Sequence, residues 1–400
     1  MLRRDRNQAD DGTISGYSLA GGAAGIGVFL HYLGEYVGDI RYRDAANVLI
    51  ESAAEAIANE PREFSLSRGF PGVGWAIAHL ANAGFINSGD YDVSELDNSI
   101  LEFVESKGAL DFDLLAGCCG LGVYALERAR GTNDSTLVDA IVCRLLRDAK
   151  HDDEGMRWFT HPQFLNSRTR ELYPRGYYSL GLSHGTPGVI ALLGRACLDG
   201  WRSDLAEDAI AESVRWLQSQ RYDDASRYGS AFPSIRDESS PMKSSRLAWC
   251  YGDLSIAVAI AAAAAALDRE SLLDEARQLA EGAAVRTEDA GVVDPAFCHG
   301  ASGVAHLFSR INLSVKSDHC AAAATRWYQR ALAFRGDNGV AGFKYFARDR
   351  GEWVSNVGLL EGVAGIGLVF ISAVSNQAPG WDRAFLIDAD CREQPVVARM

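Results

Sequence analysis

The chain has 400 residues, of which 53 are acidic and 39 are basic, so its formal net charge is −14. This balance, with no basic block beyond residues 3–6, argues against nucleic acid or an anionic membrane surface as the main partner. The sequence contains neither a secretory signal nor a transmembrane run. We therefore expect a cytoplasmic protein whose eight cysteines are thiols or metal ligands and form no disulfides.

Residues 1–17 precede the first of seven glycine-centred turns, and we expect this N-terminal segment to be flexible. Each turn stands directly before an apolar segment, and the leading glycines are 47, 48, 68, 67, 48 and 62 residues apart. A period of roughly 45 to 50 residues indicates one supersecondary unit used repeatedly, as in solenoids, propellers and helical toroids. The turns begin at Gly22, Gly69, Gly117, Gly185, Gly252, Gly300 and Gly362.

The segments that follow the turns predict buried helices. Residues 254–267, for example, are apolar except for Ser255, and a helix that is apolar on all sides must be surrounded by protein or lipid. At roughly 14 residues, these helices are too short to cross a bilayer, which takes about 20. Amphipathic segments such as 202–218 and 270–285 alternate with them. We therefore predict an all-α (α/α) toroid, one domain over residues 1–400, with seven inner helices and six to seven outer helices.

The two longest spacings between turns contain extra segments, at residues 156–179 and 222–245. Residues 156–159 and 177–180 are rich in aromatic side chains that favour strands, and residues 342–357 predict a hairpin around Asp349. We expect these pieces to be small β-hairpin additions over the mouth of the ring. The mouth is the end at which the N-termini of all the inner helices meet.

Two of the seven turns carry candidate metal ligands. Cys250 stands two residues before Gly252, and Cys298 and His299 stand directly before Gly300. Two thiolates and an imidazole are a ligand set of catalytic zinc sites, which leave a fourth position open. Because successive repeats are neighbours in a ring, the sequence predicts one zinc ion held by these three residues. The alternative is two buried thiols beside a hydrogen-bonded core histidine.

Further titratable residues occupy the same register in other turns. His184 directly precedes Gly185, Asp113 lies four residues before Gly117, and Arg246 and Tyr251 flank Cys250. All four are expected to lie at the mouth of the ring. Taken singly, His184 could equally be a hydrogen-bonded structural histidine, and Asp113 could be a helix N-cap.

These motifs resemble the lanthionine synthetase C-like (LanC) cyclases, in particular the stand-alone bacterial enzymes. The resemblance covers nearly the whole chain. The paired motifs Trp-Cys-Tyr-Gly and Cys-His-Gly are its most specific part. The sequence departs from the family at its start: the family places an outer helix before the first turn, and about twenty residues are too few to form one. Further matching stretches are residues 67–74, 181–188, 245–252, 297–300 and 380–383.

The resemblance implies a zinc-dependent cyclase. In that family, a peptide cysteine thiol adds to dehydroalanine or dehydrobutyrine in a dehydrated precursor peptide and closes (methyl)lanthionine rings. The implied partners are the precursor peptide and a separate dehydratase, with an export transporter as a further candidate. The resemblance also implies zinc ligation by Cys250, Cys298 and His299, acid/base catalysis by His184, and supporting roles for Asp113, Arg246 and Tyr251.

The chemistry of the reaction accounts for these residue types. A free thiol has a pKa of about 8.5 and is mostly protonated at neutral pH, so ligation to zinc would supply the thiolate. His184 is the candidate proton donor to the α-carbon, Asp113 could fix its orientation, and Arg246 could stabilise the enolate or orient the substrate. Two alternatives remain: a transferase that adds glutathione or another external thiol, and a non-catalytic scaffold for the precursor peptide and its dehydratase.

Overall fold

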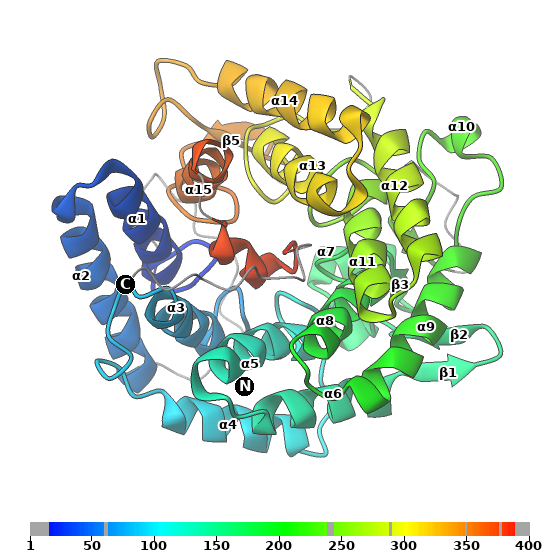
Figure 1. Cartoon of the computed structure of the whole chain (residues 1–400), viewed down its shortest axis with the longest axis horizontal. Helices are drawn as coiled ribbons and strands as arrows, with labels where there is room; N and C mark the ends of the chain where they lie inside the picture. The colour runs from blue at the N-terminus through cyan, green and yellow to red at the C-terminus, as the bar shows by residue number, and fades with distance from the viewer. Residues whose placement is uncertain are drawn as a thin grey trace.

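The computed structural model describes residues 16–59, 63–237, 244–287, 290–348, 350–375 and 378–388, and they form a ring of helices (Figure 1). Each inner helix packs against the next one, and the last packs against the first, so the inner ring is closed. This arrangement confirms the predicted toroid. Its inner helices are α1 (Ala23–Val37), α3 (Phe70–Asn82), α5 (Cys118–Thr132), α8 (Thr186–Leu198), α11 (Asp253–Ala266), α13 (Ala301–Val315) and α15 (Val363–Val374).

The glycine turns start the inner helices because the backbone folds back tightly upon itself there. The N-cap of every inner helix is the first glycine of its turn. A Cβ atom on the second glycine would meet the carbonyl oxygen six residues earlier, at 2.0 Å for Gly72 and Leu66. The fifth turn has Ser255 instead of the second glycine, and its Gly252 adopts a φ of 106°, which favours glycine. Six turns therefore share one geometry, and the fifth differs.

An outer helix follows each of the first six inner helices along the chain. In α12, Leu272, Ala276, Leu279 and Ala283 are buried, which is the apolar stripe of an amphipathic helix. Within the described residues there are six such outer helices, which agrees with the predicted six to seven, and α15 is not followed by one. They are α2 (Ile40–Asn59), α4 (Ser94–Glu105), α6 (Thr136–Asp148), α9 (Ser203–Ser219), α12 (Glu270–Ala284) and α14 (Asp318–Ala333).

After α15 the chain turns into the centre of the ring. The 3-10 helix η2 (Gly380–Phe385) lies there in Figure 1. Trp381, Phe385 and Ile387 are almost fully buried, and the Trp249 indole donates a hydrogen bond to the Phe385 carbonyl, 2.9 Å away. We call residues 378–388 the hub segment, because it contacts several inner helices at once.

Three short antiparallel strand pairs decorate the ring. The hairpin of β1 (Lys150–Asp152) and β2 (Gly155–Arg157) packs against α9 on the outside, while β3 (Tyr178–Ser179) pairs with β4 (Ile235–Arg236) at the mouth. The hairpin predicted within residues 342–357 is β5 (Tyr345–Ala347) with β6 (Glu352–Val354). Of the three strand pairs, β3–β4 is the one that lies at the mouth, where the additions were predicted. Three small helices complete the fold: η1 (Pro162–Phe164), α7 (Ser167–Leu172) and α10 (Ala225–Tyr228).

The remaining expectations concern the chain ends, the surface and the thiols. Of residues 1–17, only Gly16 and Tyr17 belong to the described part, and Tyr17 packs against Phe70 with ring centroids 5.4 Å apart.

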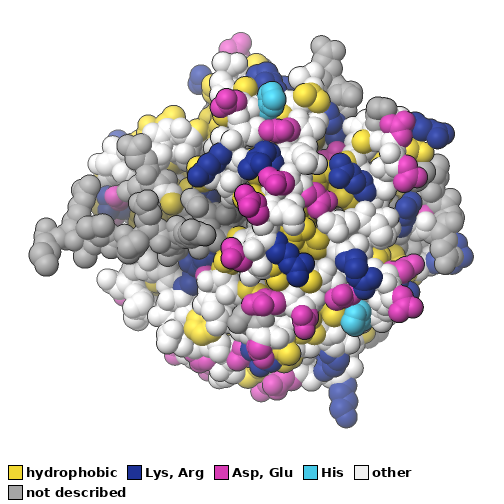
Figure 2. All heavy atoms as spheres, turned by 45° about the vertical axis from the view of Figure 1, so that its right-hand side comes forward, with side chains coloured by type: hydrophobic (Ala, Val, Ile, Leu, Met, Phe, Trp, Pro, Cys, Tyr) yellow, Lys and Arg dark blue, Asp and Glu magenta, His cyan; other side chains and the backbone are white. Residues whose placement is uncertain are grey.

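No helix of the described residues has the length and apolar character needed to cross a membrane. On the face seen in Figure 2, acidic and basic side chains are interspersed. The seven cysteines of the described residues carry free thiols.

Candidate active site at the mouth of the ring

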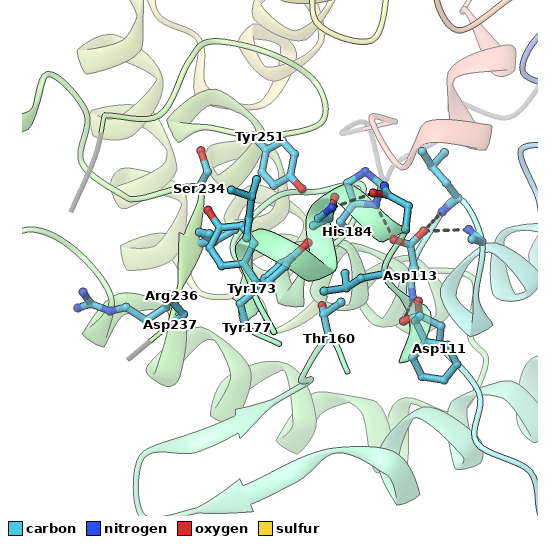
Figure 3. Close-up of a pocket in the computed structure, with 18 of the residues that line it drawn as sticks. Asp111, Asp113, Thr160, Tyr173, Tyr177, His184, Ser234, Arg236, Asp237 and Tyr251 are labelled. Carbon is cyan, nitrogen blue, oxygen red and sulfur yellow. Dashed lines mark hydrogen bonds and ion pairs between the residues drawn. The ribbon is translucent and has the colours of Figure 1, made fainter. Parts of the chain in front are cut away.

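A cavity of about 660 Å³ opens at the mouth, where the glycine turns meet the two extra segments. The turns contribute Arg68, Asp113 and His184 to its wall. The extra segments contribute Thr160, Tyr173 and Tyr177, together with β4 (Figure 3). The cavity is therefore bounded on one side by the repeats and on the other by the insertions between them. We call it the mouth cavity.

Asp113 and His184 form a hydrogen-bonded pair in the wall of the mouth cavity. Asp113 Oδ2 lies 2.5 Å from His184 Nδ1, while Asp113 Oδ1 accepts hydrogen bonds from the amides of Leu115 at 2.6 Å and Ala116 at 2.8 Å. Asp113 thus binds two amides of its own turn and also orients the histidine, but it is not a helix N-cap, because the N-cap of α5 is Gly117. The pair engages Nδ1, so Nε2 is the ring nitrogen that remains for a ligand. About a third of the His184 side chain, 34%, is exposed.

The surroundings of His184 favour its protonated form. Burial lowers the pKa of His184, but the negative charge and hydrogen bond of Asp113 outweigh this effect, and the charges of Cys250 and Asp111 act in the same direction. The resulting pKa is about 9, compared with an ordinary value of 6.5. At neutral pH, the side chain is therefore a positively charged proton donor that faces the cavity.

Asp111 is a second carboxylate in the cavity wall that sequence reasoning did not single out. Burial raises the pKa of Asp111, the neighbouring charge of Asp113 raises it further, and the result is about 7. Its backbone carbonyl receives the amide of Cys118 at 2.7 Å. In the sequence, the only indication that Asp111 belongs to the site is its place two residues before Asp113 in the same turn.

Cys250 and Cys298 lie side by side on adjacent turns. The backbone amides of Trp249 and Cys250 both donate to the Cys298 carbonyl, at 3.2 Å and 3.4 Å. Both thiols are buried, and a hydrogen bond from Cys298 lowers the pKa of Cys250, with help from the charge of Arg246. Arg246 Nη2 lies 3.5 Å from Cys250 Sγ. The structure thus brings together two of the predicted zinc ligands and the arginine.

His299 is buried one residue after Cys298. Its Nε2 lies 3.5 Å from Asp294 Oδ2, which leaves Nδ1 free to act as a ligand. A carboxylate behind the imidazole is the usual support of a metal-binding histidine, and Asp294 was not found from the sequence. Within the described part of the chain, no three His, Cys, Asp or Glu side chains are already gathered as a metal site. The donor types nevertheless fit zinc, because two buried thiols in contact stand beside an oriented imidazole.

Tyr251 belongs to the wall of the mouth cavity and directly follows Cys250 in the chain. It lines the cavity, and its ring centroid lies 5.7 Å from that of His184. Its place depends on Gly181, because a Cβ atom there would come within 2.5 Å of the Tyr251 ring. Cys250, Cys298, His299 and Arg246 do not line the cavity, although the charge of Cys250 reaches His184. The candidate residues thus form two adjacent groups: one lines the cavity, and the other, around the thiol pair, lies next to it. The first group is Asp113, His184 and Tyr251, and the second is Arg246, Cys250, Cys298 and His299.

The chain is similar in sequence and in structure to proteins of nisin biosynthesis. A family model described as "Lanthionine synthetase C-like protein" matches residues 13–386. The nisin biosynthesis protein NisC of Lactococcus lactis subsp. lactis is 24% identical over 246 residues, which are 58% of this chain and only 57% of that protein. The solved structure of nisin cyclase superposes with a TM-score of 0.77 and 21% identity, over 96% of this chain and 94% of that chain. The structural likeness shows a shared helical toroid.

Proposed function

We propose that this chain, which belongs to the lanthionine synthetase C-like family, is a lanthipeptide cyclase. It would join cysteine thiols of a dehydrated precursor peptide to dehydroalanine or dehydrobutyrine residues of the same peptide. One observation carries the proposal: a protonated histidine, oriented by Asp113, faces a cavity that adjoins a buried pair of thiols. The similarity to nisin cyclase in fold supports it.

Cys250, Cys298 and His299 would hold one zinc ion. Zinc bound there would lower the pKa of a peptide thiol at its open position and so supply a nucleophile at neutral pH. Arg246 donates to the sulfur of Cys250 and stabilises the thiolate form of that residue. Asp294 Oδ2 lies 3.5 Å from His299 Nε2, where its charge would favour an imidazole with Nδ1 turned to the metal. Arg246 and Asp294 would thus favour the metal-binding forms of Cys250 and His299 in the metal-free protein.

His184 would supply the proton that completes the addition. When sulfur bonds to the β-carbon, the π electrons of the double bond move towards the carbonyl oxygen, and the α-carbon then needs a proton. His184 Nε2 donates it, because a pKa of about 9 keeps the ring protonated at neutral pH. The proton that the thiol released replaces the one that His184 gave up, so the residue returns to its starting state.

The proposal also implies a substrate, partner proteins and a location in the cell. The dehydrated precursor peptide is its substrate, and a dehydratase must act before it, since the double bond has to exist first. The dehydratase, an export transporter and a cytoplasmic location stay predictions from the sequence.

The proposal is tested first by metal content. Elemental analysis of the purified protein should find about one zinc per chain. Cys250→Ala, Cys298→Ala and His299→Ala should lose it, whereas Cys143→Ala should retain it, because Cys143 is an exposed thiol on α6. A folded protein without zinc would contradict the metal-dependent mechanism.

Cyclisation is tested next with a dehydrated peptide. Thiol alkylation followed by mass spectrometry should show that free cysteines disappear with the intact protein and persist with the three ligand variants. Consumption of added glutathione, with the peptide cysteines left free, would favour the external-thiol transferase. A protein that binds the peptide and leaves both thiols and double bonds intact would be the scaffold.

A further inference from the structure

Tyr177 presents an unengaged phenol to the mouth cavity. The residue is 7% exposed and lines the cavity, and the hydrogen bonds found among the described residues include none to its hydroxyl group. Tyr251, in the same cavity, differs because its hydroxyl interacts with Ser179. The Tyr177 hydroxyl is not one of the buried polar atoms that lack a partner, and its residue lines the cavity, so a ligand in the cavity can reach it and supply the partner.

The backbone holds Tyr177 in one place. The amide of Thr160 donates to the Tyr177 carbonyl at 2.9 Å, and the amide of Tyr177 donates to the Thr160 carbonyl at 3.3 Å. This pairing depends on Gly176, whose φ is 82° and whose Cβ, if present, would lie 2.4 Å from the Thr160 carbonyl oxygen. The Tyr173 ring packs against Tyr177 with centroids 5.0 Å apart. A phenol positioned this way is ready to bind without rearrangement.

The charges around Tyr177 keep it a hydrogen-bond donor. Burial raises the pKa of Tyr177, and the negative charge of Asp113 raises it further, to about 12. The same Asp113 orients His184, so the phenol and the proton donor share one carboxylate neighbour. Figure 3 shows Tyr177, His184 and Tyr251 around the same space.

We propose that Tyr177 is a further catalytic residue, which donates a hydrogen bond to the carbonyl oxygen of the dehydro residue as the thiol adds. This inference rests on the proposed cyclase function. Sulfur bonds to the β-carbon, the π electrons move onto the carbonyl oxygen, and the Tyr177 hydrogen bond stabilises that charge without transferring its proton. His184 then protonates the α-carbon and the carbonyl reforms. Arg246 is less suited to this role, because its guanidinium lies beside Cys250 and outside the cavity wall.

The test is Tyr177→Phe in the full-length, zinc-loaded protein. Loss of one donor to a developing oxyanion typically costs about 10²- to 10³-fold in kcat. We expect the lower end here, about 100-fold, with KM within about 2-fold, because the phenol acts as charge develops and the ground state needs it less. Tyr91→Phe is the control, since Tyr91 is a partly buried phenol outside the cavity and should leave both parameters unchanged.

A second variant tests position instead of chemistry. Gly176→Ala keeps the phenol but forces the Thr160–Tyr177 pairing to shift, so kcat should fall in the same direction while the melting temperature is recorded. If Tyr177→Phe fails to fold, this variant carries the test. Wild-type protein that leaves the peptide open would overturn the proposed function and this inference with it. Wild-type protein that cyclises the peptide no faster than Tyr177→Phe would overturn the inference alone.

Discussion

A histidine hydrogen-bonded to a carboxylate occurs both at the mouth of the ring and around the hub segment, in two different settings. At the mouth, His184 bonds Asp113 at 2.5 Å. At the hub, His79 bonds Glu127 at 3.2 Å and His306 bonds Asp382 at 2.9 Å. Both hub carboxylates also bind an arginine: Arg383 reaches Glu127 at 2.9 Å, and Arg310 reaches Asp382 at 2.8 Å. Asp113 is held by backbone amides instead.

The balance between burial and neighbouring charges decides which histidine is protonated at neutral pH. Burial lowers the pKa of His79 and His306 more than their carboxylate partners raise it, and the charges of Arg383 and Arg310 lower it further, so both rings stay neutral. His184 has a raised pKa, because its carboxylate neighbours outweigh burial. A histidine beside a carboxylate is therefore a structural element at the hub and a proton donor at the mouth. The arginine at each hub carboxylate contributes to this difference, and so do the additional negative charges of Cys250 and Asp111 near His184.

The largest effect on activity should come from the mouth pair. His184→Gln removes the proton donor, and general acid catalysis by a positioned side chain contributes about 10²- to 10⁴-fold. We expect kcat for cyclisation to fall within that range, measured by the loss of free peptide thiols. The urea midpoint should stay close to that of the wild type, because His184 is partly exposed. Equal losses of kcat and stability would mean that His184 is a structural residue like those of the hub.

The reverse pattern is expected at the hub. Arg383→Met leaves the buried Glu127 carboxylate without its arginine, and breaking a buried ion pair from one side costs about 3 to 5 kcal/mol. The free energy of unfolding in urea should fall by that amount, while kcat per folded molecule should change little. The double variant Glu127→Gln with Arg383→Met should lose less than the sum of the two single variants, because neither charge is then left alone.

The sequence allowed the ring to be predicted because its signals are local. A glycine is required wherever the turn brings the backbone against a carbonyl six residues earlier, and this need repeats in register. The same register placed His184, Asp113 and the two thiols at one end. The hub could not be predicted, since Glu127 and Arg383 are 256 residues apart and neither has a neighbour in sequence that indicates the other.

Some residues of the site were not predicted from the sequence, for a related reason. Thr160 and Tyr177 pair across one of the extra segments, where the sequence only suggested strand-forming aromatics. Asp294 lies in the segment that leads into the turn at His299 and Gly300, but its approach to the imidazole depends on how that segment folds. Such contacts depend on how irregular backbone is placed, for which the repeat gives no template.

The smallest expected effect is a shift in pH dependence, and it tests the electrostatic origin of the contrast directly. His184 acts in its protonated form, so kcat should be constant below neutral pH and fall as the pH rises through about 9. In Asp113→Asn the carboxylate charge is gone while Oδ1 can still accept the two amides, so the pKa of His184 should drop towards its ordinary value. With a pKa of about 6.5, roughly a quarter of the molecules are protonated at pH 7, which predicts about a 4-fold loss there.

The comparison variant for that experiment is Asp111→Asn. It removes a more distant negative charge that also raises the pKa of His184, so the fall in kcat should move to lower pH by a smaller amount. The order of the two shifts is informative, because direct contact with Asp113 and a through-space effect of Asp111 differ mainly in distance. A pH profile that still falls near 9 in Asp113→Asn would mean that a different group sets it. The contrast between mouth and hub would then need a cause other than the partners of the two carboxylates.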